Sequence, residues 1–141
     1  MKLDLSIAAP MFALAGWTAF VLVLVPIVRF TAAAQGKVEQ KDFRLADSSR
    51  VPEWVARPTR NYMNLLELPV LFYTITLLLV ITQQATPAMH ILAWAYVGLR
   101  IAHSLFHLIV NQVIVRFVIF AASNLVLLAL WIDVGLRLFS P

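Results

Sequence analysis

The sequence has 141 residues, of which 62% are hydrophobic and 13% charged, with a mean hydropathy of +0.86. Soluble domains carry about 25% charged residues, so this composition excludes an ordinary water-soluble domain. At roughly 20 residues per span, the length fits four transmembrane helices and leaves no room for a soluble catalytic domain. The absence of cysteine excludes disulfides, thiolate metal sites and a cysteine nucleophile. The net charge of +4 does not indicate nucleic-acid binding, because the basic residues are scattered among apolar segments.

The first apolar segment, about 6–34, predicts a transmembrane helix that is retained. It contains no charged residue from Ile7 to Val28, and this stretch is too long for a signal-peptide core. Arg29 closes the uncharged part. The segment that follows, 35–57, carries both signs of charge with an excess of Lys and Arg, and we expect it to be a loop.

Three further helices are predicted along the rest of the chain. Pro58 suits a first helical turn, so the second helix is expected over about 58–83. The third is expected over about 87–111 and the fourth over about 113–138, because a single helix of their combined length would not fit one bilayer. We therefore predict an all-α, four-helix membrane bundle that forms one domain over 1–141. The positive-inside rule places the first and third loops in the cytoplasm.

Polar residues inside the second helix lie on one face. Arg60, Asn64 and Glu67 are spaced by four and three residues, which places them on the same side of a helix. Charged residues within a span face the bundle interior, a partner or a cavity. The pattern therefore indicates either an ion pair that holds the bundle together or a binding site. Pro69 frees a backbone carbonyl beside this face.

The third helix carries a matching polar face. Arg100, His103, His107 and Asn111 follow at steps of three, four and four. Two histidines four residues apart could contribute to a metal site, but tetrahedral sites need further ligands. We therefore predict no bound metal.

The charges of these faces indicate the chemistry of a ligand. Arg60, Arg100, Arg116 and Arg29 outnumber Glu67. Guanidinium groups bind carboxylates through two parallel hydrogen bonds, and Glu67 could accept an ammonium group. A small zwitterion with more acid than amine groups fits this pattern, and a lipid headgroup fits it too.

Two sequence blocks resemble those of the MAPEG family, the membrane-associated proteins of eicosanoid and glutathione metabolism. The run 60–69 resembles the family's second-helix signature, in which Arg, three residues, Asn, two residues and Glu precede a nearby Pro. The run 98–103, with Asn111 and Arg116 downstream, is similar to a second block. The resemblance covers essentially the whole chain and is nearest to the bacterial-type branch of the microsomal glutathione transferases.

The resemblance implies a homotrimer that binds glutathione, as co-substrate, between protomers near the cytoplasmic boundary. Arg116 would stabilise the glutathione thiolate, because only the thiolate is a good nucleophile. The ordinary pKa of a free thiol is about 8.5. The second substrate would be a hydrophobic electrophile or lipid hydroperoxide that arrives from the membrane lipids. The residues carried over as glutathione contacts are Arg60, Asn64, Glu67, Arg100, His103 and Arg29, with Glu67 meeting the amino group.

Two positions depart from the family pattern. His107 stands where the mammalian enzymes have a tyrosine, and a histidine can donate to a thiolate or act as a base near neutral pH. It is therefore the second candidate catalytic residue. Ile114 stands where the leukotriene synthase branch has a thiol-activating arginine, which argues against leukotriene synthesis.

The sequence therefore favours a glutathione-dependent membrane transferase or peroxidase. Fold and membership alone do not establish an enzyme, since the family includes a member that binds lipid mediators without catalysis. The alternative is a non-catalytic lipid- or ligand-binding scaffold that uses the same cleft. A channel or transporter subunit is a further alternative, which rests only on the intramembrane charges.

Overall fold

The computed structural model describes residues 4–44 and 48–139 and is built of helices. Two short 3-10 helices, η1 and η2, accompany five α-helices. Four helical segments are long and apolar enough to cross a membrane, namely Ser6–Ala34, Glu53–Thr82, Pro87–Ile109 and Val113–Phe139. The predicted all-α fold with four spans is confirmed, and the chain is a multi-pass membrane protein. The elements are η1 (Ser6–Ala8), α1 (Ala9–Ala34), η2 (Gln40–Phe43), α2 (Glu53–Leu66), α3 (Pro69–Thr82), α4 (Pro87–Ile109) and α5 (Val113–Phe139).

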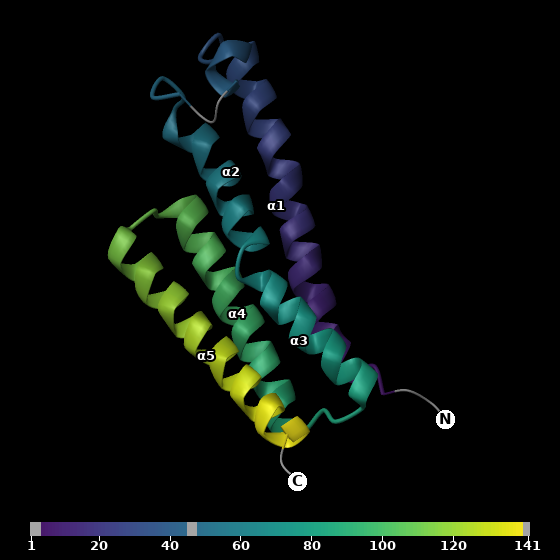
Figure 1. Ribbon diagram of the computed structural model, residues 1–141. Helices are drawn as coiled ribbons and strands as arrows, with labels where there is room; N and C mark the ends of the chain where they lie inside the picture. Colours follow the sequence, from purple (N-terminus) through teal and green to yellow (C-terminus); the bar gives the residue numbers. More distant parts are fainter. Residues whose placement is uncertain (1–3, 45–47, 140–141) are drawn as a thin grey trace.

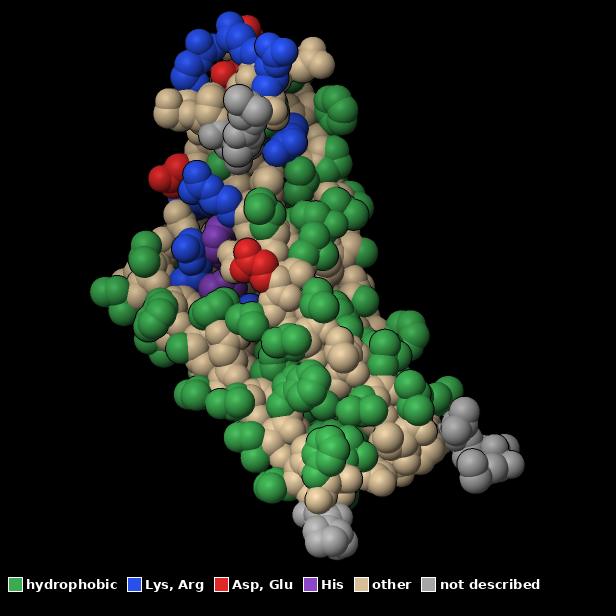
Figure 2. Space-filling model, viewed as in Figure 1, with side chains coloured by type: hydrophobic (Ala, Val, Ile, Leu, Met, Phe, Trp, Pro, Cys, Tyr) green, Lys and Arg blue, Asp and Glu red, His purple; other side chains and the backbone are tan. Residues whose placement is uncertain are grey.

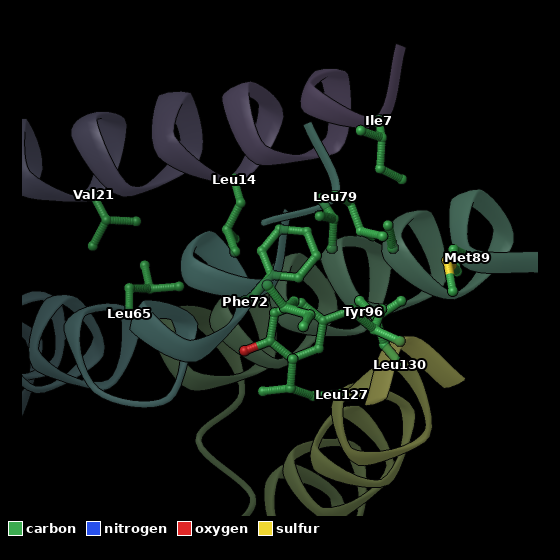
Figure 3. Close-up of a cluster of buried hydrophobic side chains, with 14 residues drawn as sticks. Ile7, Leu14, Val21, Leu65, Phe72, Leu79, Met89, Tyr96, Leu127 and Leu130 are labelled. Carbon is green, nitrogen blue, oxygen red and sulfur yellow. The ribbon is translucent and has the colours of Figure 1, made fainter. Parts of the chain in front are cut away.

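The helices pack as two antiparallel pairs. Figure 1 shows α1 beside α2, and α4 beside α5, with α3 turned away from the axis of α2. The α3–α4 turn lies at the same end as both chain ends, while the α1–α2 loop forms the opposite tip. The core between the pairs is apolar (Figure 3), and the Phe72 and Tyr96 rings lie at its centre, 4.7 Å apart. Large side chains such as Phe12, Ile81 and Phe117 remain exposed, as lipid-facing residues do.

The second span differs from the single helix expected over 58–83. It begins earlier, at Glu53, and it breaks between α2 and α3. Pro69 causes the break, because its ring cannot donate a hydrogen bond and clashes with the preceding turn. Glu67 leaves helical geometry, with φ −80° and ψ −103°, and Pro69 then occupies the first turn of α3. An acidic residue therefore lies at a break within a membrane span.

A buried carboxylate, that of Asp42, holds the turn at η2 between α1 and α2. The Glu39 backbone N–H donates to Asp42 Oδ2 over 2.9 Å, and the Ser48 hydroxyl donates to Asp42 Oδ1 over 3.0 Å. The hydrogen bond from Glu39 holds the pKa of the Asp42 carboxyl below its usual value. The loop expected over 35–57 thus contains a fixed turn, η2, and its last residues belong to α2.

One serine hydroxyl joins three helices inside the bundle. Ser104 Oγ on α4 accepts from Trp17 Nε1 on α1 over 2.8 Å and from Asn61 Nδ2 on α2 over 2.6 Å. Ser104 and Asn61 are fully buried. Polar groups in the interior of a membrane protein have no water to replace a lost partner. The hydroxyl of Ser104 therefore fixes the distance between α1, α2 and α4 beside the polar face of α4.

Replacing Ser104 by Ala should destabilise the protein by about 1–3 kcal/mol, because the half-buried Trp17 N–H would lose its acceptor and the buried Asn61 amide would keep only the Ser104 carbonyl, 3.5 Å away. Reversible unfolding of the detergent-solubilised protein would measure the change. Ser123→Ala is the matched control, since Ser123 is equally buried but its hydroxyl only donates to the Phe120 carbonyl of its own helix. Equal losses in the two variants would contradict the role of the three-helix junction.

Candidate functional site

Two adjoining cavities lie between α2, α4 and α5. They have volumes of about 240 Å³ and about 230 Å³. Val113 and Arg116 line both, so we treat the two cavities as one recess. Figure 2 shows histidine side chains beside Lys and Arg side chains, with Asp or Glu side chains nearby and hydrophobic side chains below them. The first cavity is lined by Asn64, His103, Val113, Arg116, Phe117 and Phe120, and the second by Val51, Glu53, Ala56, Arg57, Arg60, His107, Asn111, Val113 and Arg116.

The second cavity has an excess of positive charge. Arg57 Nη2 donates to Glu53 Oε2 over 2.7 Å, one turn away on α2. Arg60, a turn further along, is exposed, and no residue in 4–44 or 48–139 forms a hydrogen bond with its guanidinium. With Glu53 paired to Arg57, the charges of Arg60 and Arg116 are available to an anionic ligand.

Arg116 is held by the turn that joins α4 to α5. Its Nη1 donates to Asn111 Oδ1 over 2.6 Å. Asn111 has a φ of +54°, and its N–H donates to the Phe106 carbonyl over 2.8 Å, which closes the end of α4. Asparagine tolerates this left-handed conformation better than most residues. Asn111 therefore both reverses the chain and positions the guanidinium of Arg116.

The two histidines of α4 are buried against this arginine. His103 Nδ1–H donates to the backbone carbonyl of Arg116 over 3.0 Å, and the His103 ring lies 5.7 Å from that of Phe120. His107 lies one turn away, with ring centroids 6.2 Å apart. Within the described part of the chain, His103 Nε2 and His107 Nδ1 are buried without a hydrogen-bond partner. Two side chains that line the recess thus each carry a buried imidazole nitrogen without a partner.

The structure brings together five of the eight residues assigned by the resemblance. These five line the recess: Arg60, Asn64, His103, His107 and Arg116. They come from α2, α4 and α5, and Asn64 Nδ2 donates to the Arg60 carbonyl over 3.3 Å.

Arg100 lies inside the protomer, although it shares a helix face with His103. It is 1% exposed, and it lines neither cavity of the recess. Its Nε donates to Tyr96 Oη over 3.1 Å and its Nη2 to Asn124 Oδ1 over 2.8 Å. Its guanidinium also lies 5.1 Å from the centre of the Phe120 ring. These contacts join α4 to α5 behind the recess.

Arg29 and Glu67 also lie away from the recess. Arg29 Nη2 donates to Thr59 Oγ1 over 3.2 Å, and its guanidinium lies 4.4 Å from the Phe43 ring. It lines a separate, mainly apolar cavity of about 510 Å³ between α1 and η2. Glu67 is exposed at the α2–α3 break, and its carboxylate has no hydrogen-bond or ion-pair partner among the described residues.

Three polar residues that line the recess were not assigned a role from the sequence. Arg57 lies one turn before Arg60, and Asn111 one turn after His107, so helical spacing places each on a polar face. The spacing gave neither residue a role. Glu53 had no such signal, because the helix was expected to begin at Pro58. No group of three or more His, Cys, Asp or Glu side chains lies close enough to hold a metal ion within 4–44 and 48–139.

The family profile agrees with the two sequence blocks and the four-span fold. The profile of the MAPEG family matches residues 7–136, and the chain belongs to this family of membrane proteins of glutathione and eicosanoid metabolism. No curated protein and no solved structure matches the chain at a significant level. Members of the family generally use glutathione and are generally trimeric.

Asn111→Ala and Asn111→Gly should separate the two roles of this residue. The Ala variant should lose about 1–2 kcal/mol of stability, because alanine is strained in the left-handed conformation. It also loses the hydrogen bond between the Asn111 side chain and Arg116. The Gly variant loses that bond while the turn stays unstrained. Unfolding of both variants in detergent is the measurement. Equal stability of the two variants would show that the turn is not strained at position 111.

Proposed function

We propose that this protein is a glutathione-dependent membrane transferase or peroxidase whose glutathione site is built on the recess. The observation that carries the proposal is the meeting of Arg60 and Arg116 with His103 and His107 in one partly enclosed hollow between three helices. Glutathione has two carboxylates, one ammonium group and a thiol. Guanidinium groups suit its carboxylates, and family membership supports glutathione as the ligand class.

The thiol is activated by charge. A thiol with a pKa near ~8.5 is mainly protonated at neutral pH, and a neighbouring cation favours the nucleophilic thiolate. Arg116 is the candidate cation, because its guanidinium lines both cavities and is held by Asn111. Phe117 and Val113 are 66% exposed beside it. A hydrophobic electrophile or a lipid hydroperoxide would reach the thiolate from the bilayer along this apolar side.

Assembly as a homotrimer would complete the site. A charged side chain in the middle of a span costs about 2.5–3.5 kcal/mol on insertion scales, yet Glu67 is exposed on the protomer. A neighbouring copy and bound glutathione would cover it, and the amino group of glutathione suits its carboxylate. In this proposal Arg100 supports the site from behind Phe120. Arg29, which lines a separate cavity, acts toward the site of a neighbouring protomer. The first and third loops face the cytoplasm in this proposal.

A non-catalytic scaffold is the second candidate. The observation that favours it is His107 in the position of the family tyrosine. In that case the recess would bind glutathione or another small anion without forming a thiolate. Turnover of a generic electrophile with glutathione would contradict the scaffold.

Arg60→Ala and Glu67→Ala should each raise the Kd of glutathione at least about tenfold, because a charge-assisted hydrogen bond contributes about 1.5–3 kcal/mol. Calorimetric titration of the detergent-purified protein measures this. Arg137→Ala is the control, since Arg137 is exposed near the end of α5 and bonds only Asp133. Unchanged affinity in both site variants would contradict the site assignment.

Arg116→Ala should lower kcat by at least about tenfold with a smaller change in Kd, because a cation that stabilises the thiolate acts on the ionised thiol rather than on the resting ligand. Ultraviolet absorbance of the bound thiolate against pH measures the ionisation directly. If Arg116→Ala keeps the wild-type ionisation and His107→Phe loses it, His107 is the activating residue instead.

A further inference from the structure

The hydrogen bond from His103 to Arg116 fixes which imidazole nitrogen carries the proton. A backbone carbonyl can only accept, so His103 Nδ1 must be the donor in the 3.0 Å contact. A neutral imidazole has one N–H, and the other nitrogen is then an acceptor. His103 Nε2 therefore presents a lone pair. This nitrogen is buried, and no hydrogen-bond donor in the described chain meets it.

A buried acceptor without a donor calls for a ligand that supplies one. His103 is 4% exposed and lines the first cavity. A buried polar group that lacks its partner costs about 1–3 kcal/mol. Of the polar groups of glutathione, the thiol and the amide and ammonium N–H groups are donors. The thiol is the one whose proton has to leave before the proposed reaction.

We propose that His103, rather than bulk water, is the group that takes the thiol proton. This inference rests on the proposed function. The S–H bond breaks with its electron pair left on sulfur, and the proton forms a new N–H bond at Nε2. The products are a thiolate and an imidazolium whose Nδ1–H stays bonded to the Arg116 carbonyl. This is the logic of a nucleophile, a base and a third group that orients the base.

The proton is returned later in the reaction. When the thiolate sulfur bonds to an electrophilic carbon or to a peroxide oxygen, a carbanion, alkoxide or other leaving group gains the displaced electron pair. The imidazolium then gives its proton to that group and becomes neutral again. No additional acid is required.

The charged surroundings suit a transfer within the site. The charged or titratable groups that surround His103 are Arg100 and His107 on its own helix, Arg116 on α5, and Arg60 on α2 in the adjoining cavity. These cations oppose an isolated imidazolium. A thiolate beside it leaves the net charge of the site unchanged, and the same arginines favour the thiolate. The imidazolium is therefore stable only together with the thiolate.

The test counts protons. Glutathione is titrated into the detergent-purified full-length protein near pH 7, by calorimetry in two buffers of different ionisation enthalpy. Ultraviolet absorbance in the same samples gives the amount of thiolate. If His103 accepts the proton, thiolate forms with a net release of about zero protons; if water or buffer accepts it, about one proton is released per thiolate. S-methylglutathione, which has no ionisable thiol, supplies the background.

His103→Gln is the decisive variant. Its amide can donate to the Arg116 carbonyl and accept from a thiol, but it cannot take a proton. We expect its Kd for glutathione to stay within about threefold of wild type, since the hydrogen bonds remain. Its thiolate should fall at least about tenfold, or form with release of about one proton. His90→Gln, which removes a histidine at the start of α4, should behave as wild type.

The outcomes separate this inference from the proposed function. Release of about one proton per thiolate by the wild-type protein would overturn the role of His103, and that result does not depend on the folding of any variant. Full thiolate without proton release in His103→Gln would also overturn it, because another group such as His107 would be the acceptor. Absence of any glutathione binding to the wild-type protein would instead overturn the proposed function itself.

Discussion

The reversal of the chain at Asn111 sets the geometry of the whole site. Its left-handed backbone folds α5 back along α4, and its side chain holds the guanidinium of Arg116. The same reversal brings the Arg116 carbonyl to His103. The side chain and the backbone of one arginine therefore act on different partners. The carbonyl that orients the His103 imidazole and the guanidinium that Asn111 holds belong to the same residue, so their positions are fixed together.

Neutral partners bind most of the polar groups in the interior of the bundle. Ser104 accepts from Trp17 and Asn61, and the buried Arg100 is held by Tyr96 and Asn124. Partners without charge satisfy hydrogen bonds but leave the positive charge of Arg100 uncompensated. That charge lies close behind Phe120, on the wall of the first cavity. The field in the recess is thus more positive than its lining residues alone suggest, which favours an anionic ligand.

Helical spacing predicted which polar residues share a face, and this was enough to find four of the five assigned residues that line the recess, whereas Arg116 came from the family resemblance. It could not predict which side chains reach the recess. Arg100 and His103 are three residues apart, yet Arg100 turns to Asn124, a partner on another helix that no local pattern reveals. The α2–α3 break had a local cause in Pro69, but a proline inside a membrane helix is compatible with a continuous span. Pro58 illustrates this, because it lies inside α2 without ending it.

The α2–α3 break also constrains how the chain enters the membrane. Each half has 14 residues and is therefore about 21 Å long, whereas the hydrocarbon core is about 30 Å thick. Neither half can cross alone, and α2 is much the more polar of the two. The insertion machinery must accept both halves as one unit, with α3 supplying the apolar surface that carries Arg60 and Glu67 into the lipid. The lipophilicity of α3 thus sets how many polar groups α2 can carry within the second span.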